Sequence, residues 1–159
     1  MEKSLISDKE RPVVEIRDMD VNRLPTMRAL LASCQLPHGD LDLSRGMFVG
    51  LYKGEELIGC GGVELHGQNG LLRSVALQAS ARGKHLGRQI IQHLEDRARK
   101  KGLASLYLLT EKAGEFFDHH HYQAVARDKV PDAIKESTEF AHVCPSTAVA
   151  MVKHLNPES

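Results

Sequence analysis

The sequence has few of the residues that mark specialised classes of protein. It contains no tryptophan and only three cysteines, Cys34, Cys60 and Cys144, which are widely spaced and form no CxxC pair. This spacing argues against a disulfide framework and against a thiolate zinc site. A reducing compartment is therefore the default expectation.

Long apolar runs and a net charge are also missing. The apolar runs are far shorter than the roughly 20 residues that a membrane helix needs, and the polar N-terminus does not resemble a signal peptide. Twenty-one Lys and Arg balance twenty-one Asp and Glu. A neutral chain lacks the net positive charge that is typical of a nucleic-acid or membrane-surface binder. We therefore expect a cytoplasmic protein that meets any anionic ligand with a local cluster of positive charge.

The 159 residues, 42% of them hydrophobic, suffice for one domain with a real core. We expect a flexible leader over residues 1–12 and a single domain over residues 13–155. Periodicity and turn signals predict strands at 13–16, 47–52, 56–65, 70–77, 104–110, 122–126 and 147–154, and helices at 23–33, 83–101 and 111–119, with shorter helical pieces at 41–45 and 131–139. Hairpins followed by a strand–helix–strand unit indicate a mixed α/β sheet.

Two of these segments allow predictions for individual side chains. In the helix at 83–101, an apolar face is expected to pack inward, and the opposite face to point outward with Arg88, Gln92, Glu95, Arg99 and Lys100. Gly102 is a plausible residue for ending this helix. In the strand at 70–77, alternation places Leu72, Ser74 and Ala76 on one face and Leu71, Arg73, Val75 and Leu77 on the other.

The segment Arg-Gly-Lys-His-Leu-Gly, residues 82–87, lies between that strand and that helix. Unpaired backbone N–H groups and the positive end of the helix dipole meet at such a junction, which favours phosphate binding. Glycines let the main chain approach a ligand closely, and Arg82, Lys84, His85 and Arg88 add positive charge. The alternative is a glycine-containing loop that only starts an exposed helix.

The flanking sequence favours the first interpretation. Leu-Leu-Arg-Ser-Val-Ala-Leu (71–77) followed by residues 82–87 resembles the acetyl-CoA site of the GCN5-related N-acetyltransferase (GNAT) superfamily. Its signature is Gln/Arg-x-x-Gly-x-Gly/Ala after a strand that ends in an apolar–Ala–apolar triplet. The resemblance covers about residues 13–122. It implies the GNAT fold, a mostly antiparallel twisted sheet splayed at its centre with helices on both faces, and acetyl-CoA as co-substrate with no metal.

One position departs from this signature, because its first glycine is His85 here, where a positive φ is costly. The resemblance implies that the main chain of the triplet at 75–77 pairs with the pantetheine arm and that residues 83–88 hold the pyrophosphate. A backbone N–H of the triplet would polarise the thioester carbonyl. The implied cofactor-binding residues are Val75, Ala76, Leu77, Arg82, Gly83, Lys84, His85, Leu86, Gly87, Arg88 and Phe117.

Catalytic candidates follow from the need for a neutral amine and a protonated leaving thiolate. Glu64, beside the expected splay, is the first candidate base and Glu111 the second; a solvated carboxylate and a helix cap are the respective alternatives. Many superfamily members protonate the thiolate with a tyrosine at the position of Phe117, which has no proton to give. Either water protonates the thiolate, or Tyr122 or another group does so.

Candidate substrate contacts lie on the third strand and in the C-terminal segment. Arg73 or Ser74 is expected to face the cleft, and arginine is a natural bidentate partner for a carboxylate; an outward arginine is the alternative. Cys144 and Ser146 either line the same cleft or pack. His119, His120 and His121 are consecutive and diverge, which argues against a metal site. In the superfamily a glycine precedes the aromatic residue at Tyr122, so we expect His121 in a turn.

A narrower resemblance lies in the C-terminal third. The segments 106–111, 116–117, 130–131, 134, 139–140 and 144–146 are similar to GNAT enzymes encoded in arsenic-resistance operons and, more distantly, to short bacterial N-acetylglutamate synthases. This implies a small amino-acid-like amine as acceptor, with neither nucleic acid nor membrane as partner and a homodimer left open. Acetylation of a peptide or protein, a CoA-binding regulatory module with little turnover, and a scaffold that binds no CoA are the alternatives.

Overall fold

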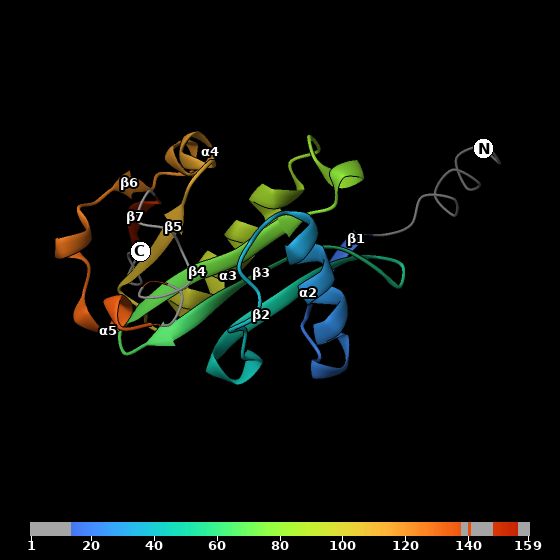
Figure 1. The fold of residues 1–159 in the computed structure, drawn as a ribbon, viewed down its shortest axis with the longest axis horizontal. Helices are drawn as coiled ribbons and strands as arrows, with labels where there is room; N and C mark the ends of the chain where they lie inside the picture. The colour runs from blue at the N-terminus through green and yellow to red at the C-terminus, as the bar shows by residue number, and fades with distance from the viewer. Residues whose placement is uncertain (1–13, 138–139, 141–147, 156–159) are drawn as a thin grey trace.

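The computed structural model describes residues 14–137, 140 and 148–155, and these form a twisted sheet with helices on both faces (Figure 1). The sheet has seven strands in the order β1-β2-β3-β4-β5-β7-β6, and neighbours run antiparallel except for the parallel pair β4 and β5. The strands are β1 (Val14–Asp18), β2 (Gly46–Lys53), β3 (Glu56–His66), β4 (Asn69–Leu77), β5 (Ser105–Thr110), β6 (Gln123–Ala124) and β7 (Val149–His154). The predicted fold class is confirmed.

The helices are α2 (Leu24–Ser33), α3 (Leu86–Lys100), α4 (Gly114–His119) and α5 (Asp132–Lys135), with short 3-10 turns at Val21–Arg23, Leu43–Arg45, Ala79–Ala81 and Arg127–Lys129. Several predicted ends shift. The helix predicted from residue 83 begins at Leu86, because Gly83 and His85 have positive φ and form a turn before it. In the piece predicted over 131–139, the described residues, 131–137, contain the four-residue α5. The leader, Val13, Cys144 and Ser146 lie outside the described residues.

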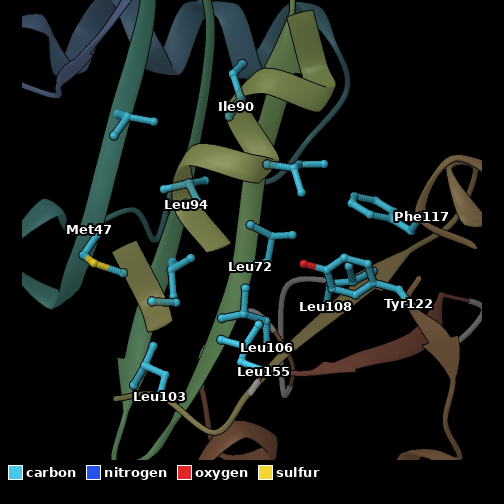
Figure 2. Close-up of a cluster of buried hydrophobic side chains, with 14 of the residues drawn as sticks. Met47, Leu72, Ile90, Leu94, Leu103, Leu106, Leu108, Phe117, Tyr122 and Leu155 are labelled. Atoms are coloured by element: carbon cyan, nitrogen blue, oxygen red, sulfur yellow. The ribbon is translucent and has the colours of Figure 1, made fainter. Parts of the chain in front are cut away.

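Two main cores lie on opposite faces of the sheet, beneath α3 and beneath α2 (Figure 1). On the α3 side, Ile90 and Leu94 pack over Met47 and Leu72, and this core continues to Phe117 and Tyr122 (Figure 2). On the α2 side, the buried residues include Met27, Leu31, Phe48 and Ala76. Apolar residues at helical spacing on each helix account for this arrangement. Among the described residues, no helix combines the length and the apolar character needed to span a bilayer.

A β-bulge in β4 overturns the predicted alternation of that strand. Cys60 pairs with Ala76 and Gly62 pairs with Arg73, so three steps along β4 match two along β3. Ser74, inside this interval, has a φ of +62°. The extra residue reverses the facing of the residues that come after it in the strand. Leu72 therefore belongs to the core under α3 while Ala76 belongs to the core under α2, and the prediction that they share a face was wrong.

The parallel pairing of β4 with β5 is short. It joins Asn69 to Ser105, Gly70 to Leu106 and Leu71 to Tyr107, and the ladder does not extend farther. Beyond these pairs the two strands separate, as the expected splay requires. The second half of β4 therefore has β3 on one side and no ladder partner among the described residues on the other. A strand edge of this kind can pair with an extended ligand.

Candidate active site

The unpaired half of β4 opens into a cavity of about 980 Å³ between α3 and α4. Its lining comes from the loop after α2, from β4, the turn before α3, α3 itself, α4 with the residues on either side of it, and one residue of β7. The lining residues are Cys34, Leu36, Val75, Ala76, Leu77, Arg82, Gly83, His85, Leu86, Gly87, Arg88, Ile91, Gln92, Glu95, Ala113, Phe116, Phe117, His119, His120, His121 and Lys153. Of the cofactor-binding residues predicted from the sequence, Lys84 alone is outside this lining, exposed in the same turn.

The turn before α3 directs main-chain N–H groups, which could bind an anion, toward the cavity. Gly83 has a φ of +78° and His85 a φ of +62° with ψ of 19°, a left-handed conformation that precedes the first helical residue. The first N–H groups of a helix have no partner inside it. The side chain of His85 makes no capping bond to the helix, which leaves those N–H groups available to a ligand. His85 thus adopts the positive φ that the glycine of the signature would supply.

Gly87 forms part of the cavity wall inside the first turn of α3. A Cβ placed there would lie 3.5 Å from Cζ of Phe116 and 3.6 Å from Cδ1 of Leu77, which is ordinary van der Waals contact. A methyl group would therefore fit, whereas a longer side chain would extend into the cavity. Leu77, Phe116 and Phe117 give the wall an apolar surface beside the cationic turn. The cationic turn, the apolar wall and the edge of β4 that lacks a ladder partner together fit the phosphate and pantetheine parts of CoA.

A buried ionic network lies on the α2 side of the sheet. The Arg73 guanidinium, fully buried, donates to both oxygens of Asp40 at 2.6 and 2.9 Å and to Glu64 at 3.0 Å, and its Nε donates to Ser74 Oγ at 3.1 Å. Glu64 also contacts Nε2 of His66 at 2.9 Å. The bond from Arg73 holds the pKa of Asp40 below its ordinary value. This network ties the loop after α2 to the bulge of β4.

A second buried network lies on the α3 side. Glu95 is 4% exposed, and its two oxygens accept from the Tyr122 hydroxyl at 2.8 Å and from Lys153 Nζ at 2.9 Å. The Tyr122 hydroxyl points from its ring toward α3 in Figure 2. The prediction that Glu95 faces outward was wrong. Glu95 follows Ile91 by four residues and precedes Ala98 by three, so helical spacing did place it on the buried face.

The structure separates the remaining predicted catalytic and substrate residues. Glu64, Arg73 and Ser74 belong to the network on the α2 side, while Tyr122 belongs to the network on the α3 side. Glu111 is exposed between β5 and α4. None of these five lines the cavity within the described part of the chain. Their predicted roles are not tested by this arrangement and stay predictions.

Burial and charge modify the pKa values of two groups near the sites. Desolvation raises the pKa of the Tyr122 hydroxyl, and the Glu95 carboxylate adds to this effect. Burial also raises the pKa of the Cys60 thiol to about 12, and this thiol donates to the Ser74 carbonyl at 3.2 Å. Both groups are therefore protonated and weak acids at neutral pH.

The histidine run lies along one side of the cavity. His121 has a φ of +73°, so the expected turn position is confirmed, and His119, His120 and His121 all line the cavity. Within the described ranges, no group of three or more His, Cys, Asp or Glu side chains is placed to hold a metal ion.

Comparison with known proteins identifies the family. The model of the acetyltransferase (GNAT) family matches residues 13–124. The chain belongs to this family. The GNAT protein is 34% identical over 70 residues to an uncharacterised N-acetyltransferase, YsnE, from Bacillus subtilis, covering 43% of this chain and 46% of the relative.

Solved structures share the GNAT fold. N-acetylglutamate synthase from Neisseria gonorrhoeae, solved with coenzyme A and N-acetyl-glutamate, superimposes with a TM-score of 0.77 at 20% identity over 92% of this chain and 36% of that one. A Mycobacterium tuberculosis protein solved with CoA gives a TM-score of 0.73 at 19% identity, covering 89% of this chain and 99% of the other. The chain thus spans less than half of the YsnE relative and about a third of the neisserial enzyme.

Proposed function

We propose that this protein is an acetyl-CoA-dependent N-acetyltransferase that acetylates the amine of a small amino-acid-like molecule by direct transfer in a ternary complex. The observation that carries this proposal is the unpaired half of β4, which opens into a cavity of about 980 Å³ beside the cationic turn before α3. Family membership and the CoA-bound structures with the same fold support the choice of co-substrate.

Main-chain groups would position the co-substrate. The N–H groups at the start of α3 and the side chains of Arg82 and Arg88 would hold the pyrophosphate, and the edge of β4 would pair with the pantetheine amides. Bound acetyl-CoA supplies an activated acetyl carbonyl, and a main-chain N–H of residues 75–77 would polarise it. Phe116 and Phe117 would cover the arm and exclude water.

The transfer forms a bond between the amine nitrogen and the acetyl carbon and breaks the carbon–sulfur bond. The nitrogen loses its proton to a base or to water, and the thiolate gains one. Phe117 has no proton to give, and Tyr122 has a raised pKa while its hydroxyl donates to Glu95. Water is therefore a better proton source for the thiolate than Tyr122.

Glu64 remains the first candidate for activating the amine, and Glu64→Gln tests it. We expect kcat to fall about tenfold or more, because general-base catalysis contributes roughly 10²–10⁴, while the Kd for CoA changes less than about twofold, because Glu64 does not line the cavity. Steady-state kinetics and calorimetric titration measure these two quantities. Glu56→Gln, on the exposed start of the same strand, is the matched control, and wild-type turnover in Glu64→Gln removes Glu64 as the base.

The acceptor class rests on the fold shared with N-acetylglutamate synthase and on the narrower arsenic-operon resemblance, which stays a prediction. The sequence predicts Arg73 as a partner for a substrate carboxylate, yet Asp40 accepts from both of its terminal nitrogens. A carboxylate on the acceptor would have to replace Asp40 or use another cation. The homodimer and the cytoplasmic location also stay predictions.

Release of thiol from acetyl-CoA in the presence of a panel of amino acids and their analogues tests the proposed function. Turnover with one class of small amine is the expected result. Turnover only with peptides would contradict the acceptor class. Tight binding of CoA without turnover by any acceptor would instead identify a CoA-binding regulatory module.

A further inference from the structure

The sheet consists of two halves that are joined by a short ladder. The first half contains β1 to β4, with α3 packed on β2, β3 and β4, and the second contains β5, β7 and β6 with α4 beside them (Figure 1). Three residue pairs between β4 and β5, from Asn69 to Leu71 along β4, form the ladder between the halves. The cavity opens where this ladder ends, so its width depends on how far apart the two halves are held.

Glu95, a side chain of the first half, makes buried polar contacts with the second half. Its carboxylate accepts from the Tyr122 hydroxyl at 2.8 Å and from Lys153 Nζ at 2.9 Å. Glu95 lies on α3, whereas Lys153 lies on β7 and Tyr122 directly precedes β6. Figure 2 shows the Tyr122 hydroxyl directed from its ring toward α3. Both bonds therefore connect the two halves of the sheet.

The bond to Tyr122 also fixes the position of α4, which forms the opposite wall of the cavity. The Tyr122 N–H donates to the Phe117 carbonyl at 3.0 Å, and the two rings are in edge-to-face contact with their centroids 5.5 Å apart. Phe117 lines the cavity, whereas Tyr122 is fully buried behind the described lining. Apolar contacts are non-directional, but a charge-assisted hydrogen bond has a defined length and direction. Glu95 thus specifies the distance between α3 and the α4 wall.

We propose that Glu95 is a positioning residue that sets the width of the cavity for coenzyme A, by holding α4 through Tyr122 and β7 through Lys153. This inference rests on the proposed use of acetyl-CoA. Without these bonds the two halves would sample several separations, and CoA would bind only the fraction of molecules with the correct one. The apparent Kd rises as that fraction falls. A network that serves stability alone would lower the unfolding temperature when broken and leave the Kd unchanged.

Tyr122→Phe tests this role, because it removes only the hydroxyl that donates to Glu95, from a residue outside the described lining of the cavity. We expect the Kd for CoA, measured by calorimetric titration of the full chain, to rise about fivefold or more, since a hydrogen bond to a charged group is lost. A proton donor to the thiolate would instead change kcat and leave this Kd unchanged. Lys153→Met should act in the same direction, and Lys153→Arg, which can still donate to Glu95, should restore the affinity to within about twofold of wild type.

Hydrogen exchange measured by mass spectrometry gives an independent readout of the separation between the halves. In Tyr122→Phe without CoA, we expect faster exchange over residues 105–110 and 114–124, while peptides from β1, β2 and β3 exchange as in wild type. Bound CoA should restore the protection, since it contacts both walls. Equally faster exchange in every strand would show a general loss of stability and would overturn the positioning role.

Ser105→Ala is the matched control, because it also removes a buried hydroxyl that takes part in a hydrogen bond. Ser105 Oγ lies 2.7 Å from Nδ1 of His154, and both residues belong to the second half of the sheet. This variant should lower the unfolding temperature while its Kd for CoA stays within about twofold of wild type. An unchanged Kd in both Tyr122→Phe and Lys153→Met would overturn the role of Glu95 and leave the proposed function standing. Failure of CoA to bind wild-type protein would overturn the two together.

Discussion

Gly87→Asp is expected to weaken CoA binding by about 100-fold or more, a change of about 2.7 kcal/mol, while the fold remains as stable as wild type. Gly87 lies in the wall of the cavity, where an added Cβ would make ordinary van der Waals contact with Phe116 and Leu77 and a longer side chain would extend into the cavity. A carboxylate there would occupy the space proposed for the pyrophosphate. Two like charges about 4 Å apart repel by about 4 kcal/mol at an effective dielectric constant of about 20.

The stability of this variant has a separate physical reason. An acidic residue in the first turn of a helix interacts favourably with the dipole, and glycine is the poorer helix former. The loss of binding would therefore not result from unfolding. Calorimetric titration with CoA gives the affinity and thermal unfolding gives the stability.

Gln89→Asp provides the matched control for Gly87→Asp. It adds the same charge to the first turn of α3 at an exposed residue that does not line the cavity. We expect its affinity for CoA to change less than about threefold, since solvent and salt screen a charge on an exposed side chain. Wild-type affinity in Gly87→Asp would show that the phosphate is held elsewhere, and equal losses in both variants would indicate a general effect of charge.

The cofactor side of the site was predictable because its information is local. A strand, a glycine-containing turn and a helix start follow one another within residues 71–88, and the geometry of helix ends determines where the N–H groups point. Only the exact start of the helix differed from the prediction, since two residues with a positive φ precede Leu86. The mostly antiparallel sheet and its splay followed from the family resemblance carried by the same segment.

The polar networks were not predictable in this way, because their partners are distant in the sequence. Arg73 pairs with Asp40 across 33 positions, and Glu95 pairs with Lys153 across 58. No periodic pattern specifies such partners. The bulge at Ser74 added a second difficulty, since strict alternation assigns the wrong face to every residue after the extra one. The burial of Glu95 could nevertheless have been predicted, because its position in the helical repeat places it on the buried face of α3.

Arg73→Met is expected to lower the free energy of unfolding at pH 7 by about 3–5 kcal/mol, the usual effect of removing one partner from a buried ion pair. The substitution keeps an unbranched apolar stem but leaves the Asp40 and Glu64 carboxylates, 10% and 8% exposed, without the guanidinium. Urea unfolding at pH 7 measures the change. Arg45→Met is the matched control, since its pair with Asp42 is exposed at 69% and 48% and surface pairs contribute only about 0–1 kcal/mol.

The same substitution should change the dependence of stability on pH. Arg73 holds the folded-state pKa of Asp40 below its ordinary value of 3.8, so the stabilisation is complete above about pH 4 and is lost as the pH falls through the lower folded-state value. In Arg73→Met the buried Asp40 carboxylate would lose this partner and its pKa would instead be raised by burial, so its protonation would reduce the destabilisation of the variant as the pH falls. The difference between wild type and Arg73→Met should therefore be largest at pH 7 and shrink toward pH 3. A difference that stays constant over this range would show that Arg73 stabilises the fold by packing alone.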